Sequence, residues 1–191
     1  MPNETNGGHA AGTHVPLRLH HTAYVVKDQR ATRRFYEELI GLELAATWTE
    51  KDFLFGADRV YCHTFYTLAD GSALAFFQFA EERDYEEFGP QFRPTPFIHV
   101  ALKTEPSTQD AIVERLERAG YDHYVLEHGY CRSMYVTDPD GLLLEFTVDH
   151  PDVAEISAER RRMASSDFER WLGGDHTSNN TYRPADEPVN A

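Results

Sequence analysis

The chain of 191 residues is poor in cysteine and in basic side chains, and it has no long hydrophobic run. Two distant cysteines, Cys62 and Cys131, make neither a disulfide framework nor a zinc-knuckle spacing. No apolar run approaches the roughly 18–20 residues of a membrane-spanning helix. Lys and Arg number 18 against 32 Asp and Glu, a formal net charge of -14, which argues against binding to a nucleic-acid backbone. The first residues carry neither a basic start nor an apolar stretch, so we expect no signal peptide and a cytoplasmic protein.

Apolar residues make up 41% of the chain, including 12 Phe and 10 Tyr, which is enough for a sizeable core. The length suits one domain, or two small halves that share a core. Residues 1–16 and 174–191 are polar and without periodicity, so we predict a flexible arm and a flexible tail. The segment 150–173 is predicted to carry a C-terminal helix over residues 157–172.

Between these ends the sequence repeats one pattern twice. Residues 17–80 and 96–149 each read as a strand, a helix and three further strands, with the helices over 29–40 and about 107–119. The stretch 81–95 is polar and rich in proline, which predicts a linker. We therefore predict an α+β fold of two βαβββ modules that form a curved mixed sheet around a central cleft, with the helices outside.

Histidines occupy similar places in the first strand of each copy: His20 and His21 in the first, His99 in the second. Glu145 lies in the last strand of the second copy, inside the apolar run LLLEF. A carboxylate that points inward there is costly unless it is paired or bound to a metal. Two imidazoles and one carboxylate are the ligand set of non-haem iron sites that bind substrate and dioxygen together.

The segments HHTAYVVKD, RRFYEELIGLEL and CRSMYVTDPDGLLLEF resemble the vicinal oxygen chelate superfamily, over about residues 17–148. That superfamily includes glyoxalases, bleomycin- and fosfomycin-resistance proteins and extradiol dioxygenases. The resemblance implies that His21, His99 and Glu145 are the metal ligands. The run from His128 through Tyr135 to Glu145 is similar to the extradiol signature, although Leu126 departs from it. By this similarity His128 is an acid/base beside the metal, and Tyr135 donates a hydrogen bond to a substrate oxygen.

Only one of His20 and His21 can face the cleft, because adjacent strand residues point to opposite sides. The family pattern places its histidine seven positions before the Asp that starts the helix, here Asp28, which favours His21. Counting back from Gly41, as His99 lies 21 residues before Gly120, favours His20 instead. We take His21 as the ligand and keep His20 as the alternative.

These features lead to a metal-dependent extradiol-type dioxygenase that cleaves a catecholic substrate with O2, using Fe(II), or Mn(II) as second choice. One alternative is a glyoxalase-type isomerase or lyase with Zn or Ni, in which Gln78 is the candidate for a fourth ligand. Another is a non-catalytic drug-binding resistance protein. We expect a small-molecule substrate, no nucleic-acid or membrane partner, and a homodimer.

Overall fold

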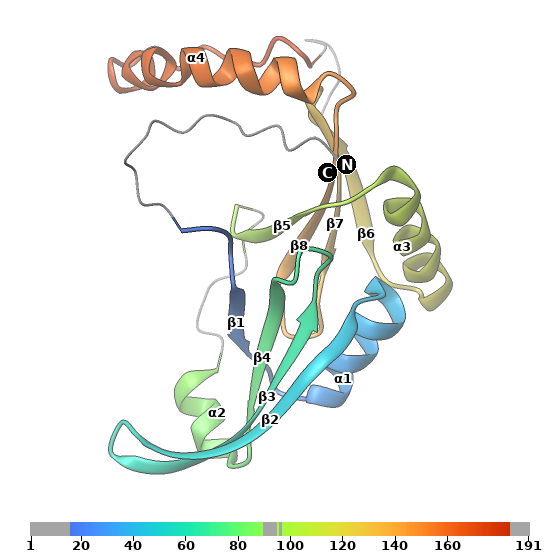
Figure 1. Cartoon of the computed structure of the whole chain (residues 1–191), viewed down its shortest axis with the longest axis vertical. Coiled ribbons are helices and arrows are strands. Elements are labelled where there is room, and N and C mark those ends of the chain that lie inside the picture. The colour runs from blue at the N-terminus through green and yellow to red at the C-terminus, as the bar shows by residue number, and fades with distance from the viewer. Residues whose placement is uncertain (1–15, 90–94, 96, 184–191) are drawn as a thin grey trace, which may run out of the picture.

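A computed structural model describes residues 16–89, 95 and 97–183 (Figure 1). It contains two four-stranded mixed sheets with helices, which confirms the predicted α+β class and the two modules. Residues 1–15 of the predicted arm, 184–191 of the predicted tail, and 90–94 of the predicted linker lie outside the described residues. The predicted flexibility of the arm and the tail therefore stays a prediction.

The first module forms a sheet of strand order β1-β4-β3-β2, in which β1 runs parallel to β4. Its helix begins at Asp28, whose side chain accepts a hydrogen bond from the backbone N–H of Arg30, and ends at Gly41 with φ +91°. This is the helix predicted over 29–40, although its second part is π-helical. The elements are β1 (His21–Val25), α1 (Gln29–Arg33), η1 (Arg34–Ile40), β2 (Glu43–Leu54), β3 (Ala57–Thr67) and β4 (Ala73–Phe79).

The second module repeats this topology with the strand order β5-β8-β7-β6, and β5 runs parallel to β8. Its helix begins one residue before the predicted range and ends at Gly120, again with a positive φ. The elements are β5 (His99–Lys103), α3 (Pro106–Ala119), β6 (His123–Glu127), β7 (Cys131–Thr137) and β8 (Leu143–Asp149).

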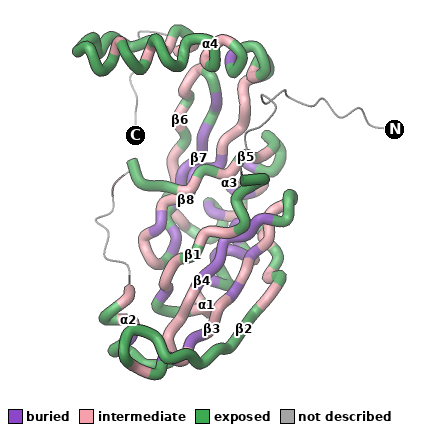
Figure 2. The backbone as a smooth tube through the Cα atoms, turned by 60° about the vertical axis from the view of Figure 1, so that its left-hand side comes forward, coloured by how far each residue is buried: buried purple, intermediate pink, exposed green. Residues whose placement is uncertain are grey.

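Two helices lie outside the repeated pattern. The stretch predicted as a linker contains α2 (Glu82–Phe88), which is tied to β3 by ion pairs from Arg59 to Asp84 and Glu87. The C-terminal helix α4 (Val153–Leu172) begins four residues before the prediction and is exposed along most of its length (Figure 2). Among the described residues, no helix combines the length and apolar character needed to cross a membrane.

The helices of the two modules pack against one another, and Figure 1 shows α1 and α3 on the same side of the molecule. Arg115 of α3 donates to the carbonyl oxygens of Leu39 and Ile40, at 2.6 and 2.9 Å. One apolar cluster includes Phe35 and Ile112, from the two helices, and residues of both sheets. Each helix therefore buries one side against its own sheet and another against its neighbour.

This packing changes one detail of the prediction. The two sheets remain separate within one chain, so they do not form a single curved sheet around a cleft. Each sheet has one face that packs on the helical core of α1, η1 and α3, and we call the opposite face its helix-free face because none of these three helices covers it. At one end of this face, α2 contacts Arg59 and Phe79 of the first module, and α4 lies beside Cys131 and Thr147 of the second. The predicted site residues are best described by the helix-free face to which each belongs.

The hydroxyl of Tyr36 joins the modules by donating to Asp138, 3.0 Å away, in the turn between β7 and β8. Burial raises the pKa of Asp138, although its hydrogen bonds oppose this effect. We expect Tyr36→Phe to lower the free energy of unfolding by about 1–3 kcal/mol near neutral pH, because a buried acceptor loses its donor. The deficit should shrink as the pH falls through the raised pKa of Asp138, because protonation removes the charge that the bond stabilised.

Urea unfolding at several pH values measures this difference. Tyr121→Phe is the matched control, because Tyr121 packs on the same core and its hydroxyl makes no hydrogen bond to the described residues. Equal losses in the two variants would show that the Tyr36–Asp138 bond contributes nothing specific.

Candidate metal centre

The last strand of the second module explains how a carboxylate fits into an apolar run. Leu144 and Phe146 of β8 belong to the core cluster, so Glu145, between them, points to the helix-free face. On the neighbouring strand β7, Met134 and Val136 are core residues, and Tyr135 lies opposite Glu145 in register. Strand alternation therefore separates the polar side chains from the core within a few residues.

His99, the first residue of β5, contacts Glu145 on this face. Its Nε2 lies 2.8 Å from Oε2 of Glu145. Two ligand atoms at about 2.1 Å from a metal, at a right angle, are roughly 3 Å apart. The atoms that face each other are also the ones that ligate divalent metals in proteins. The distance and the chemistry of this pair therefore fit a metal ion.

Glu145 is only 8% exposed, yet its carboxylate is kept charged. Burial raises the pKa of Glu145. Hydrogen bonds from Ser133, Tyr135 and Thr147, together with the nearby His99, lower this pKa by a larger amount, so the net shift is downward. The Thr147 hydroxyl donates to Oε1 at 3.0 Å, which leaves Oε2 for His99. A charged and oriented carboxylate is what a metal ligand requires.

Tyr135 and His128 extend this set of hydrogen bonds. Nε2 of His128 lies 3.0 Å from the hydroxyl of Tyr135, which also bonds Glu145. Burial and the neighbouring carboxylate raise the pKa of Tyr135, so the phenol stays neutral and donates its single proton to Glu145. His128 must then carry its proton on Nε2 and donate to the phenol oxygen. The structure thus brings together four of the five predicted site residues: His99, His128, Tyr135 and Glu145.

The fifth, His21, lies on the other sheet. It begins β1, and its ring centroid is 5.4 Å from that of Phe65 and 6.2 Å from that of His63. Its Nδ1 lies 2.7 Å from Nδ1 of His20, which precedes the strand. Within the described part of one chain, no three metal-ligating side chains gather, so His21 does not join His99 and Glu145 there. The choice between His20 and His21 stays a prediction.

His63 shares the environment of His21, and the sequence pattern did not single it out. Its ring stacks on Phe77, with 3.7 Å between the centroids, and its Nε2 is buried without a hydrogen-bond partner among the described residues. Burial and the nearby His21 lower the pKa of His63, which favours the neutral imidazole. Only the register of β3 against β4 places His63 beside Phe77, and this register was not readable from the sequence.

Gln78, the candidate fourth ligand of an isomerase, points to the helical side of its sheet. Its side-chain oxygen accepts the backbone N–H of Gln29 at 2.7 Å, at the start of α1. Its neighbour Phe77, which stacks on His63, occupies the helix-free face instead. Gln78 is therefore engaged in holding the helix, and this geometry gives no support to a fourth ligand at that position.

Comparison with known proteins places the chain in a family. A model of the Glyoxalase/Bleomycin resistance protein/Dioxygenase superfamily matches residues 18–146. The chain therefore belongs to this superfamily, which confirms the family resemblance read from the sequence. The match does not distinguish the extradiol branch from the others.

Individual relatives add detail. The chain is 28% identical over 130 residues to the glutathione transferase FosA of Serratia marcescens, covering 68% of this chain and 79% of that protein. Its fold is similar to the fosfomycin resistance protein FosX of Listeria monocytogenes (20% identity, TM-score 0.53, 73% of this chain and 98% of that one). It is also similar to a glyoxylase/bleomycin resistance protein/dioxygenase domain from Frankia sp. EAN1pec (16% identity, TM-score 0.55, 72% and 95%).

The geometry around Glu145 leads to a direct test of metal binding. Glu145→Gln keeps the shape and removes the charge, so we expect metal content to fall by at least about tenfold, because the ligand must be anionic. Elemental analysis after anaerobic loading with iron(II) or manganese(II) measures this content. Glu43→Gln is the control, since Glu43 is an exposed strand carboxylate in the other module. Stoichiometric metal in Glu145→Gln would remove Glu145 from the ligand set.

Proposed function

We propose that this protein is a metal-dependent dioxygenase of the extradiol type, which opens a catecholic ring beside its two hydroxyls with O2. The observation that carries the proposal is the hydrogen-bonded series His128–Tyr135–Glu145, next to His99. It pairs a metal-ligand set with an acid/base group, which ring opening needs and simple drug binding does not. His21, His99 and Glu145 are the proposed ligands, and iron(II) is the proposed metal, with manganese(II) second.

The side chains have separate roles in this proposal. A divalent metal held by the three ligands supplies positive charge that favours ionisation of the diol and a template for the diol and O2. Tyr135 stays neutral, and in the proposed site its one proton would be donated to a substrate oxygen when Glu145 is bound to the metal instead. His128 holds a proton on Nε2 beside the phenol oxygen, so the pair can deliver a proton as negative charge develops on the opening ring.

The helix-free face of the first module suits a flat aromatic substrate. It presents the rings of His63, Phe65 and Phe77, together with Trp48, which is opposite His63 in register and more than half exposed. Aromatic faces of this kind bind planar rings by stacking and by removing apolar surface from water. This face also carries His21, so it adjoins the metal in the proposed site.

A second candidate is a fosfomycin-modifying reaction, because FosA is a relative at 28% identity. Fosfomycin is an anionic phosphonate, and such a substrate needs free cationic side chains. Among the described strand residues that point to the two helix-free faces, the Lys and Arg side chains are Arg59 and Lys103. Arg59 pairs with Asp84 and Glu87, and Lys103 pairs with Asp149 at 2.5 Å. Both strand cations are therefore already paired with carboxylates, which gives a phosphonate less support from the strands than an aromatic diol has.

We further propose that the working site forms between two copies of the chain. His21 lies on one sheet and the His99–Glu145 pair on the other, and one chain does not bring them together. In a two-fold symmetric dimer, the helix-free face of the first module in one copy would cover that of the second module in its partner. Two identical sites would result, each with His21 from one copy and His99 and Glu145 from the other.

The role of His128 is tested by His128→Gln, whose amide can still bond Tyr135 but cannot deliver a proton at neutral pH. We expect kcat for catechol cleavage to fall about 100-fold or more, the usual contribution of an acid/base group, with metal content unchanged. Oxygen uptake and product absorbance over a panel of catechols measure the rate. His123→Gln is the control, since His123 lies on β6 and its ring contacts the carbonyl of Tyr121.

Parallel assays separate the candidates. Oxygen consumption with a catechol supports the dioxygenase. Turnover of fosfomycin with glutathione or water, without activity on any catechol, would replace this proposal with the second candidate. A catechol rate that His128→Gln leaves unchanged would remove His128 from the mechanism.

The shared site is tested by mixing two inactive variants, His21→Ala and Glu145→Gln. A mixed dimer would contain one intact site, with His21 from the Glu145→Gln copy and His99 and Glu145 from the other. Random mixing makes about half of the dimers mixed, so we expect roughly a quarter of the wild-type activity to return. Co-expression with two different tags measures this recovery. Each variant mixed with itself is the control, and no recovery in isolated mixed dimers would show that the site does not span two copies.

A further inference from the structure

The chain returns to the candidate site after α4. Residues 174–183 leave the helix and reach the loop between β6 and β7, where the side-chain amide of Asn180 donates to the backbone carbonyl of His128 at 3.0 Å. The oxygen of the same side chain accepts the backbone N–H of Tyr182 at 3.2 Å. Asn180 therefore joins the C-terminal segment to the residue that we propose as the acid/base.

Gly129, next to His128, lies directly against this segment. Its φ is +80°, and a Cβ built on it would lie 2.3 Å from the carbonyl oxygen of Tyr182. Glycine is thus required twice, by the backbone conformation and by the close approach of another backbone. The contact involves main-chain atoms on both sides, so a flexible side chain cannot relieve it.

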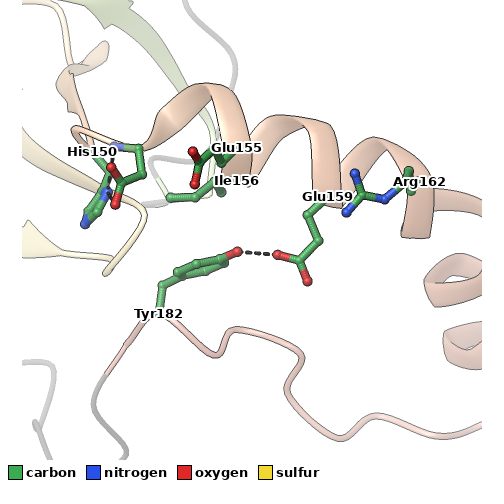
Figure 3. A pocket seen from close by; sticks show the side chains of 7 residues that line it. His150, Glu155, Ile156, Glu159, Arg162 and Tyr182 are labelled. Carbon is green, nitrogen blue, oxygen red and sulfur yellow. Dashed lines mark hydrogen bonds and ion pairs between the residues drawn. The ribbon is translucent and has the colours of Figure 1, made fainter.

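The C-terminal segment is itself tied to α4. The hydroxyl of Tyr182 donates to Glu159, and Figure 3 shows the Tyr182 ring reaching across to the helix. The amide of Asn179 donates to Asp167 at 2.8 Å, and Arg160 donates to the carbonyl oxygen of Asn179 at 3.3 Å. These bonds come from three positions along α4, so the segment has a defined path over the helix.

The loop is also held from its other end, where the backbone N–H of His150 donates to the carbonyl of Tyr130 at 3.3 Å. The ring of Tyr130 stacks on that of His128, with 5.8 Å between centroids. At the start of the loop, the side-chain amide of Asn180 donates to the carbonyl of His128. The backbone N–H of His128 also donates to the carbonyl of Cys131 at 2.9 Å, within the loop itself. The His128 loop is thus held both by its own turn and by a segment about fifty residues further along the chain.

We propose that the C-terminal segment is a working part of the site, in which Asn180 and Tyr182 are positioning residues that hold the His128 loop so that the imidazole meets Tyr135. This inference rests on the proposed function for the role of His128, but the holding of the loop is independent of the reaction. A misplacement of about 1 Å at an acid/base group can cost roughly 100-fold in rate.

The test compares Asn180→Ala with the wild-type full-length protein and with Thr181→Ala. Thr181 is the matched control because it is exposed in the same segment, and its side chain makes no hydrogen bond to the described residues. We expect kcat on a catechol to fall about 10- to 100-fold in Asn180→Ala, with KM and metal content unchanged. Amide hydrogen exchange of residues 128–131 should become faster, while Thr181→Ala should leave both measurements at wild-type values.

Gly129→Ala tests the same contact by changing the loop instead of the C-terminal segment. Its added Cβ must displace the segment, so we expect the same split between kcat and KM, with a thermal melt to verify folding. If the loop exchanges faster in Asn180→Ala but the wild-type protein cleaves no catechol, the C-terminal segment does hold the loop, and the proposed function is refuted. Unchanged exchange and unchanged kcat in Asn180→Ala would overturn the positioning role, whatever the reaction.

Discussion

A charged carboxylate inside an apolar strand, that of Glu145, is the constraint on which the candidate site depends. Burial alone would favour its neutral form, and the hydroxyls of Ser133, Tyr135 and Thr147 reverse that preference. These donors lie on β7 and on β8 itself, so the register of the two strands is what keeps the charge in place. His99 is relevant to chemistry because it lies 2.8 Å from this carboxylate, and His128 because it bonds Tyr135, which in turn bonds Glu145.

The shared helical core has a consequence for the two sheets. Because η1 and α3 bury their apolar sides against each other as well as against the strands, the modules of one chain meet through their helices. His21 and the aromatic rings therefore lie on the opposite face of one sheet, and His99 and Glu145 on that of the other, and we propose that a second copy of the chain brings these two faces together. Stability of the monomer and assembly of the proposed site are therefore served by opposite faces of the same sheets.

Helix α4 and the segment after it lie outside the repeated pattern, and both contact the second module. Helix α4 supplies anchoring points for the segment that follows it, and this segment contacts the loop carrying His128. Loops that carry functional groups are held by contacts that can come from anywhere in the chain. In this protein those contacts come from residues that lie outside the match to the superfamily.

Local patterns were sufficient for much of the fold. The helix over 29–40, its stop at Gly41, the two modules and the α+β class followed from apolar periodicity and from repetition, because these depend on near neighbours along the chain. The sequence showed that Glu145 lies among leucines and a phenylalanine but left its direction open, and the packing of Leu144 and Phe146 in the core decided it. By contrast, the separation of His21 from His99, the inward direction of Gln78, the stacking of His63 on Phe77 and the reach of Asn180 to His128 were decided only by tertiary structure. Each depends on strand register or on the docking of distant segments, and these are set by long-range packing that no local pattern encodes.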